Sequence, residues 1–361
     1  MMIEIAIKAV LAFLVIFNVL NFAGLHTWIE RKQSALMQDR IGANRADIFG
    51  FTFFGLFHPI ADAVKMFTKE DFIPEGANKL LHTLAPFLSV VFAFAAFATI
   101  PFGDVLHVGG RVINLQVANI NVGLLYIMAM MSMGVYGVVL AGFSSNNNYA
   151  FLGGMRGAAQ MIAYEITMGA AIMGVILVFN TLDLQLLVRG QGEYLFNGWL
   201  PKWGIFVQPL AFILFLTAAA AETKRTPFDL PEGESEIIGY FVEYSGMKFG
   251  MFFLADLVET VLVAALMTTL FLGGWQVPYL HPDGFHFPWG AHAALSNIPV
   301  VLLGVLAFFI KLSFFIWLLM AVRWTLPRFR YDQLMRLGWK ILLPASLANI
   351  AVTAIVLIML R

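Results

Sequence analysis

Long apolar stretches separated by short polar loops run along almost the whole chain. A helix needs about 20 apolar residues to cross the hydrocarbon core of a bilayer. Eight stretches are close to or above that length: residues 5–28, 82–105, 118–143, 158–181, 204–222, 237–272, 297–323 and 340–360. The first is too long for the apolar region of a signal peptide and has no small-residue cleavage site. The pattern therefore predicts an all-α polytopic membrane protein with about eight transmembrane helices in a single domain, residues 1–361.

The sixth stretch, residues 237–272, is too long for one span perpendicular to the bilayer, so we expect it to tilt strongly or to extend out of the membrane. It carries four ionisable residues: Glu243, Lys248, Asp256 and Glu259. Charged groups at membrane depth are costly unless protein or water surrounds them. We therefore expect protein or water neighbours for these side chains.

The distribution of Lys and Arg indicates which loops face the cytoplasm. Fifteen of the 22 lie in loops 29–81, 144–157, 223–236 and 324–339 or at their flanking ends, and five lie on the opposite side, which carries both termini. Because cytoplasmic loops are enriched in Lys and Arg, we expect the first set of loops to be cytoplasmic. Both termini and loop 273–296 are then periplasmic, or face the equivalent organellar compartment.

The first cytoplasmic loop, residues 29–81, contains a second kind of pattern. Over residues 51–68 apolar residues dominate one side, and Pro59 is placed to lie in a first helical turn. Polar residues recur at helical spacing: His58, Asp62, Lys65 and Lys69. This arrangement predicts an amphipathic helix lying at the membrane interface between the first two spans.

Composition narrows the possible functions. The chain is 60% hydrophobic with a mean hydropathy of +0.82 and only 12% charged residues, and its net charge of zero argues against a nucleic-acid partner. Cysteine is absent, which excludes disulfides, thiolate metal sites, iron–sulfur ligation and cysteine nucleophiles on this chain. The seven histidines lack metal-motif spacing such as HExxH, and no glycine-rich phosphate motif precedes a helix. We therefore expect neither a metal nor a nucleotide site.

An acidic run interrupts this apolar chain between the fifth and sixth spans. The six carboxylates are Glu222, Asp229, Glu232, Glu234, Glu236 and Glu243, and loop 223–236 holds four of them. An exposed acidic loop is one reading. However, residues 227–231 interleave proline and apolar side chains with the charges, as in a packed loop. Clustered carboxylates titrate as a coupled set, and such groups near a membrane usually mark a proton path or a polar cavity.

Glu165 is a second candidate for proton transfer. Arg156 stands at the expected cytoplasmic edge of the fourth span, and Glu165 follows nine residues later, about 13 Å deeper at 1.5 Å per residue. A structural carboxylate bonded to Tyr or Ser of another helix is one alternative. A protonatable relay group is the other, because desolvation brings a carboxyl group closer to exchange at neutral pH.

Two pairs of residues, each with one acidic and one basic side chain, suggest a polar cavity near the first loop. Glu30 and Arg31 follow Trp28 at the end of the first span, where they either anchor the helix or line a cavity. Asp62 and Lys65 share a helix face, where they form either a surface ion pair of little energetic value or one wall of a chamber. An amphiphile with a polar head could enter such a chamber from lipid, against apolar residues such as Phe54, Phe57 and Met66.

Several long segments resemble one known family. They are WIERKQSALMQDRIGANRAD and HPIADAVKMFTKED in the first loop, RGAAQMIAYEI in span four, and AETKRTPFDLPEGESE with EYSGMKFGMFFLAD around span six. These segments resemble the membrane protein family, called the H subunit or subunit 1, of respiratory complex I, the proton-pumping NADH:quinone oxidoreductase. The resemblance covers essentially the whole chain.

The resemblance implies roles for individual residues. It places the quinone chamber at Glu30, Arg31, Arg45, Asp62, Lys65 and Phe228. It places the proton path at Glu165, Glu222, Asp229, Glu232, Glu234, Glu236 and Glu243, with Arg156 and Arg225 as supporting basic residues. No catalytic side chain and no metal ligand is implied.

The resemblance also implies an enzyme subunit without a redox centre of its own. Quinone is then the substrate, while partner subunits carry the NADH site, FMN and iron–sulfur clusters. The expected partners are hydrophilic quinone-site subunits, small and antiporter-like membrane subunits, and lipid. The expected location is the bacterial plasma (inner) membrane, with the mitochondrial inner membrane as the alternative. Two other functions stay open: the equivalent membrane subunit of an energy-converting hydrogenase, and an unrelated ion transporter.

Overall fold

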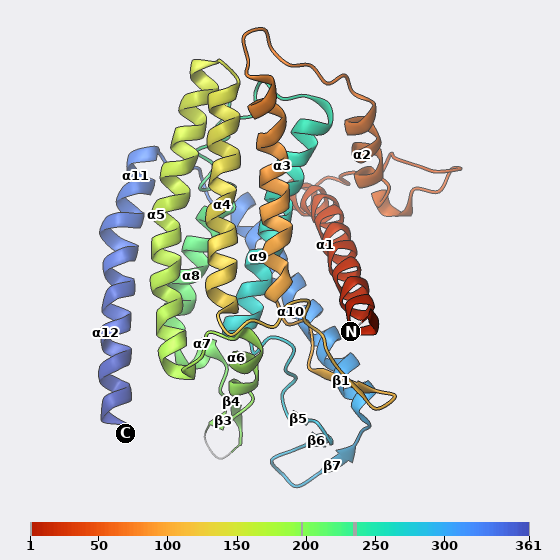
Figure 1. Ribbon diagram of the computed structural model, residues 1–361, viewed down its shortest axis with the longest axis vertical. Helices are drawn as coiled ribbons and strands as arrows, with labels where there is room; N and C mark the ends of the chain where they lie inside the picture. Colours follow the sequence, from red (N-terminus) through yellow and green to blue (C-terminus); the bar gives the residue numbers. More distant parts are fainter. Residues whose placement is uncertain (1, 196–197, 234–236, 361) are drawn as a thin grey trace.

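A bundle of long apolar helices forms the body of the molecule (Figure 1). The structure is a computed structural model and describes residues 2–195, 198–233 and 237–360. Within those residues seven helical segments are long and apolar enough to cross a membrane. They are α1 (Met2–Met37), α3 (Lys79–Ala95) with η2 (Ala96–Thr99), α4 (Gly123–Ser144), α5 (Asn148–Phe179), α9 (Gly246–Phe271), α10 (Asn297–Thr325) and the run from α11 (Tyr331–Arg336) through the π-helical turn η3 (Leu337–Leu342) to α12 (Leu343–Met359). The predicted fold class, an all-α polytopic membrane protein, is confirmed.

Two spans start or end well away from their predicted limits. α1 continues nine residues beyond the expected end at residue 28, so Glu30 and Arg31 lie on a helix and not in a loop. α5 begins ten residues earlier than expected, because the Asn147 side chain accepts a hydrogen bond from the Tyr149 N–H and caps the helix there. Arg156 therefore lies within α5 and not at its edge.

The fifth predicted span, residues 204–222, is divided into two helices. α7 (Gly204–Val207) stops at Gln208, and α8 (Pro209–Glu222) begins with the proline at its first turn, where a missing N–H costs nothing. The 14 residues of α8 extend about 21 Å, less than the ~30 Å of a hydrocarbon core. Consequently Glu222, the last residue of α8, lies inside the bundle with 3% of its surface exposed.

The sixth predicted span is shorter than expected, because its first nine residues, 237–245, form a loop. α9 begins at Gly246, which has a φ of +56° and faces the segment after α2 (His58–Thr68). A Cβ at this position would lie 2.9 Å from the Lys69 carbonyl oxygen. Only glycine fits both the backbone conformation and the space, so the helix start is fixed against that segment.

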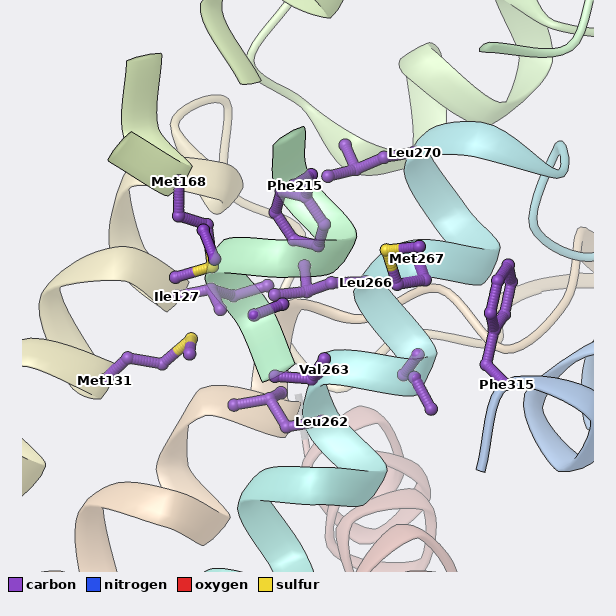
Figure 2. Close-up of a cluster of buried hydrophobic side chains, with 14 of the residues drawn as sticks. Ile127, Met131, Met168, Phe215, Leu262, Val263, Leu266, Met267, Leu270 and Phe315 are labelled. Carbon is purple, nitrogen blue, oxygen red and sulfur yellow. The ribbon is translucent and has the colours of Figure 1, made fainter. Parts of the chain in front are cut away.

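The core surrounds α9. In the apolar window of α9 72% of the residues are buried, against 6% in that of α1, which lies at the edge of the bundle. Figure 2 shows α9 meeting side chains of α4, α5, α8 and α10 in this core. The labelled residues are Ile127, Met131, Met168, Phe215, Leu262, Val263, Leu266, Met267, Leu270 and Phe315. Asp256 and Glu259, the two acidic residues of α9, are therefore packed inside the bundle.

The two ends of the bundle differ. One end carries both termini, the short helix α6 (Leu184–Gly190) and small antiparallel sheets (Figure 1). The strands are β1 (Val105–Val108) with β2 (Arg111–Asn114), β3 (Tyr194–Leu195) with β4 (Leu200–Pro201), and β5 (Leu280–His281), β6 (Gly284–His286) and β7 (His292–Ala294) in order. The last three lie in the predicted loop 273–296. The termini thus share one end, as predicted.

The other end carries α2 (Figure 1). The predicted amphipathic helix over residues 51–68 forms only from His58, with Pro59 in its first turn as expected, and a short 3₁₀ turn η1 (Phe53–Gly55) precedes it. The late start follows from the backbone: Phe53, Phe54 and Gly55 all have positive φ, which no continuous right-handed helix accommodates. α2 contacts α1 and α9.

Candidate functional site

An ion pair joins α1 to α2 at the end of the bundle. The Arg31 guanidinium donates to the Asp62 carboxylate, and the two side chains remain 41% and 38% exposed. An exposed pair of this kind contributes about 0–1 kcal/mol, so its main effect is to fix the position of α2. Lys65 lies one turn beyond Asp62 and is exposed. The structure therefore brings Arg31 and Asp62 together and leaves Lys65 at the surface.

A basic hollow adjoins this ion pair. It has a volume of about 340 Å³ and is lined by Arg31, Ser34, Arg40, Gly42, Ala43, Asn44, Arg45 and His58. His58 Nε2 accepts a hydrogen bond of 3.3 Å from the Ala46 N–H, which holds the loop against α2. Three guanidinium groups around one open hollow can bind an anionic or carbonyl-bearing polar group. Arg45 thus lines the same hollow as Arg31.

Glu30 points into the bundle and meets two arginines. Glu30 is 9% exposed and forms an ion pair with Arg323 of α10. It also accepts a hydrogen bond of 3.3 Å from Arg225 Nη1. Arg225 also lies 3.5 Å from the ring of His26 on α1. These contacts connect α1, the acidic loop and α10. Arg225, expected as a partner for acids of its own loop, is paired with Glu30 of a distant helix.

Lys224, the residue before Arg225, lies in a second buried cluster. Its Nζ is 2.8 Å from Asp256 Oδ1 and 3.2 Å from Glu259 Oε2 on α9, and its side chain is 3% exposed. Burial alone would lower the pKa of Lys224, but the charges of Asp256 and Glu259 outweigh burial and raise the pKa well above its ordinary value. The expectation that these two acids need protein neighbours is confirmed.

Glu232 adds a further carboxyl group to this cluster. Burial raises the pKa of Glu232 well above its ordinary value, and the charges of Asp256 and Asp229 raise it further, against the opposing effect of Arg225. Tyr240 is fully buried beside the same charges, and burial raises the pKa of its hydroxyl. Glu232 is therefore a group that can hold a proton at pH values where an exposed glutamate is ionised.

The part of the loop around Phe228 and Asp229 is tightly anchored. Asp229 pairs with Arg328 at 2.7 Å. Phe228, 5% exposed, stacks on Phe329 with 5.6 Å between ring centroids, and the Gln160 amide of α5 donates to the Phe228 carbonyl at 2.6 Å. The prediction of a packed loop is confirmed for these residues. Phe228, expected at the chamber, is part of the buried core between α5 and the segment after α10.

Glu165 and Glu222 belong to two further helices, α5 and α8. The Ser132 hydroxyl of α4 donates to Glu165, as the structural alternative predicted. Glu222 is buried at the end of α8, and its Oε2 has no hydrogen-bond partner among the described residues. It lies close enough to Glu165, Glu259 and Lys224 for their charges to act on it. Three helices thus contribute carboxyl groups to one polar cluster, in which Glu222 is buried and Glu165 half-buried.

Glu243 does not extend this line into the span as expected. It lies in the loop before α9, where the Asn147 side-chain amide donates to its Oε1 at 2.7 Å. Nearby, His82 stacks on Tyr244 with 4.0 Å between ring centroids, and Lys248 pairs with Asp71 at 3.1 Å. Asp256 lies ten residues into α9, about 15 Å along its axis. Glu243 therefore forms a separate polar group nearer the helix start.

The structure changes the list of candidate residues in other ways. The Arg156 guanidinium lies over the ring of Tyr331 on α11, 5.7 Å from its centroid. Glu234 and Glu236 lie outside the described residues.

The sequence analysis did not include five charged residues that the structure places at the site: Lys224, Asp256, Glu259, Arg323 and Arg328. Their signal was present, because each is an ionisable residue in or beside an apolar span.

Within the described parts of the chain, no group of three or more His, Asp or Glu residues is arranged to hold a metal ion. The buried groups can instead accept, store and release protons. They can also change conformation with charge, because carboxylates in contact influence one another's titration.

A family model with the description NADH dehydrogenase matches residues 9–354. Similar proteins include the first NADH-quinone oxidoreductase H subunit of Cytophaga hutchinsonii, 46% identical over 91% of this chain and 90% of that protein. The H subunit of Thermomicrobium roseum is also 46% identical, over 97% of this chain and 96% of its own length. The second H subunit of Geobacter metallireducens is 46% identical over 97% and 95%. By this match, which extends over nearly the whole length of each protein, the chain belongs to the family of the NADH-quinone oxidoreductase H subunit.

Proposed function

We propose that this chain forms the membrane-side part of a quinone-binding chamber and couples quinone reduction to proton translocation. Its relatives are named as subunits of an oxidoreductase that acts on NADH and quinone. The proposal adds two points for this chain: where the quinone head is held, and which carboxyl groups respond to its reduction.

One observation carries the coupling proposal. Arg225 contacts Glu30, beside the exposed Arg31–Asp62 pair, and the preceding residue Lys224 contacts Asp256 and Glu259. Beyond Lys224, the charges of Glu259 and Glu165 act on Glu222. Ion pairs therefore lead from Glu30 beside the α1–α2 junction to Asp256 and Glu259 inside the bundle, and the consecutive loop residues Lys224 and Arg225 join the two halves.

The chamber is assigned to the α1–α2 junction. A quinone head is a flat apolar ring with two carbonyl oxygens, so it needs hydrogen-bond donors on one side and apolar walls on the other. Arg31, Arg40 and Arg45 supply donors around the basic hollow. Phe54, 79% exposed, lies on the loop leading to α2 and offers an apolar surface toward lipid. Entry from the bilayer between α1 and α2 follows from this arrangement.

Coupling follows from charge. Reduction of a quinone to a quinol consumes two electrons and two protons, so it changes the charge near Glu30 until protons arrive. A shift of one pKa unit corresponds to about 1.4 kcal/mol, and several coupled carboxyl groups are needed to transmit a useful part of the driving force. Glu232, Glu222 and Glu165 are the groups that we assign to this response, together with Glu234, Glu236 and Glu243 as further members of the path.

The chain works as a subunit without its own redox centre. NADH oxidation, FMN and the iron–sulfur clusters belong to partner subunits, and antiporter-like membrane subunits receive the protonation change. The location that we propose is a bacterial plasma membrane, with both termini in the periplasm. That assignment is supported by the positively charged loops at the α2 end and by the bacterial source of the similar proteins. An energy-converting hydrogenase subunit or an unrelated ion transporter is disfavoured by the names of those relatives.

A Glu222→Gln variant of the assembled complex tests the coupling proposal. Glutamine keeps the shape but cannot exchange a proton, so NADH-driven proton pumping and quinone reduction should fall by about tenfold or more. Electron transfer from NADH to an artificial acceptor, which needs no membrane subunit, should stay unchanged.

A Glu193→Gln variant is the matched control, because Glu193 is a 68% exposed carboxylate at the opposite end of the bundle. Parent-like pumping and quinone reduction in the Glu222→Gln complex would refute the role given to Glu222.

A further inference from the structure

Two histidines face each other on the small sheet at the end of the bundle that carries the termini. His286 lies at the end of β6 and His292 at the start of β7, and they are direct cross-strand partners. Both side chains are exposed to solvent. This pair lies at the opposite end of the molecule from the candidate chamber (Figure 1).

The pair occupies the ladder position where side chains come closest. The Phe287 N–H donates to the Ala291 carbonyl at 3.0 Å, and the Leu295 N–H donates to the Asp283 carbonyl at 3.0 Å. This pattern makes His286 and His292 a non-hydrogen-bonded pair, whose Cα atoms are only about 4.5 Å apart. The backbone register therefore brings the two side chains together, and their rotamers set the distance between the rings.

The two Nδ1 atoms face each other at hydrogen-bonding distance, and a metal ion bound by both would give nearly the same separation. The two Nδ1 atoms are 3.1 Å apart, and the ring centroids are 4.7 Å apart. Two nitrogens that bind one Zn²⁺ ion at about 2.0–2.1 Å with tetrahedral geometry are about 3.3 Å from each other. The observed distance differs from that value by a few tenths of an ångström, which a small ring rotation supplies.

A third ring contacts this pair. His281 on β5 meets the His286 ring edge to face, with 5.0 Å between centroids. A pair of ligands that is already oriented loses little conformational entropy when it binds an ion.

We propose that His286 and His292 bind one divalent transition-metal ion of the kind that prefers imidazole, such as Zn²⁺ or Cu²⁺, with water completing its coordination. The ion links β6 to β7 and so stiffens the sheet. β5 of the same sheet, through Leu280 and His281, lines a cavity of about 460 Å³. The proposal is independent of the quinone function, because its residues belong to a different end of the bundle.

The sequence pattern alone does not indicate this site. His286 and His292 are six residues apart, a spacing that matches no metal motif on a helix. Only the turn at residues 287–291 folds them onto each other.

Titration of the purified, metal-depleted complex with Zn²⁺ tests the proposal. Compared with the parent, His286→Gln and His292→Gln should each lose one binding event or weaken it by at least about tenfold, since each removes half of the protein ligands. His107→Gln is the control, because His107 is another exposed histidine, on β1 at the same end. It should bind like the parent.

Electron paramagnetic resonance with Cu²⁺ gives a second, local measurement. The parent should show a signal from Cu²⁺ bound by two imidazole nitrogens, and either variant should show at most one nitrogen from this pair. Unchanged binding in both variants would refute the site. Equal losses in His107→Gln and His292→Gln would mean that surface histidines bind an adventitious ion only, and would also overturn the proposal.

Discussion

Lys224 lies between two carboxylates of α9 in a site almost closed to water. Its pKa is raised by those carboxylates in spite of burial, so the side chain stays protonated throughout the physiological pH range. Removing one partner from such a buried pair leaves an uncompensated charge and is strongly destabilising. Any change of protonation in this cluster therefore falls on carboxyl groups, of which Glu232 is the best placed outside the spans.

The pKa of Glu232 predicts a pH dependence of stability. Because burial raises it above the ordinary value of 4.5, the folded state binds more protons than the unfolded state between that value and the folded pKa. Stability falls as pH rises through this window. A Glu232→Gln variant cannot ionise, so its thermal midpoint should fall less between pH 5 and pH 8 than that of the parent complex.

Differential scanning calorimetry of the parent and Glu232→Gln complexes at several pH values provides this measurement. A Glu193→Gln complex, in which the replaced carboxylate is exposed, is the control. Identical pH dependence in parent and Glu232→Gln would show that the carboxyl group titrates as it does in the unfolded chain.

At the scale of elements, the position of α2 depends on few contacts. α2 packs against α1 and α9, and its only ion pair to α1 among the described residues joins Arg31 to Asp62. Its helix begins late, after a backbone with positive φ at Phe53 and Phe54. An element with so few buried contacts is able to move locally, and such mobility suits the entrance of a chamber that admits a lipid-soluble substrate.

Substitution of this ion pair should weaken quinone turnover. Arg31→Ala and Asp62→Asn each break the ion pair between α1 and α2 and remove a charge from the proposed chamber wall. An exposed pair contributes about 1 kcal/mol at most, so the KM for quinone should rise about fivefold, and the two changes together should cost less than their sum. Steady-state kinetics and inhibitor titration of the complex give the result.

Arg111→Ala, at the opposite end on β2, serves as the control. Quinone and inhibitor titrations that match the parent in both variants would rule out the chamber assignment.

At the scale of the whole molecule, the bundle separates two environments. One end carries α2, beside the basic hollow, and the other carries the termini and the small sheets (Figure 1). Between them, α9 runs through the core and holds Asp256 and Glu259, while α5 and α8 contribute Glu165 and Glu222. The short α8 ends inside the bundle, which is why Glu222 is buried and not at a surface.

Glu165→Gln tests whether the interior carboxyl groups act together. Ser132 can still bond to a glutamine, so the fold should be retained, but proton exchange at this position is lost. Pumping-linked quinone reductase activity should fall about tenfold or more, with NADH oxidation by an artificial acceptor intact. Proton-pumping assays in proteoliposomes would decide the question, and unchanged pumping would leave Glu165 with the structural role alone.

Some parts of the site were predictable because they depend on local sequence. Asp62 was expected on an amphipathic helix, and the loop around Phe228 was expected to pack because proline and apolar residues interleave with its charges. Other parts depend on chain segments far apart in sequence. The partner of Arg225 is Glu30, 195 residues away, and Lys224 pairs with acids more than 30 residues later. No local pattern contains such pairings.

The order of the apolar segments, the membrane character, the placement of both termini at one end and the family were all predictable from the chain. These follow from hydrophobic periodicity, charge distribution and long motifs, which are properties of neighbouring residues. The ends of α8 and α9, the pairing of the buried charges and the contact between His286 and His292 follow instead from how the chain packs. The physical reason is that a buried charge is tolerated only beside its partner, and partners become neighbours only after the helices have packed.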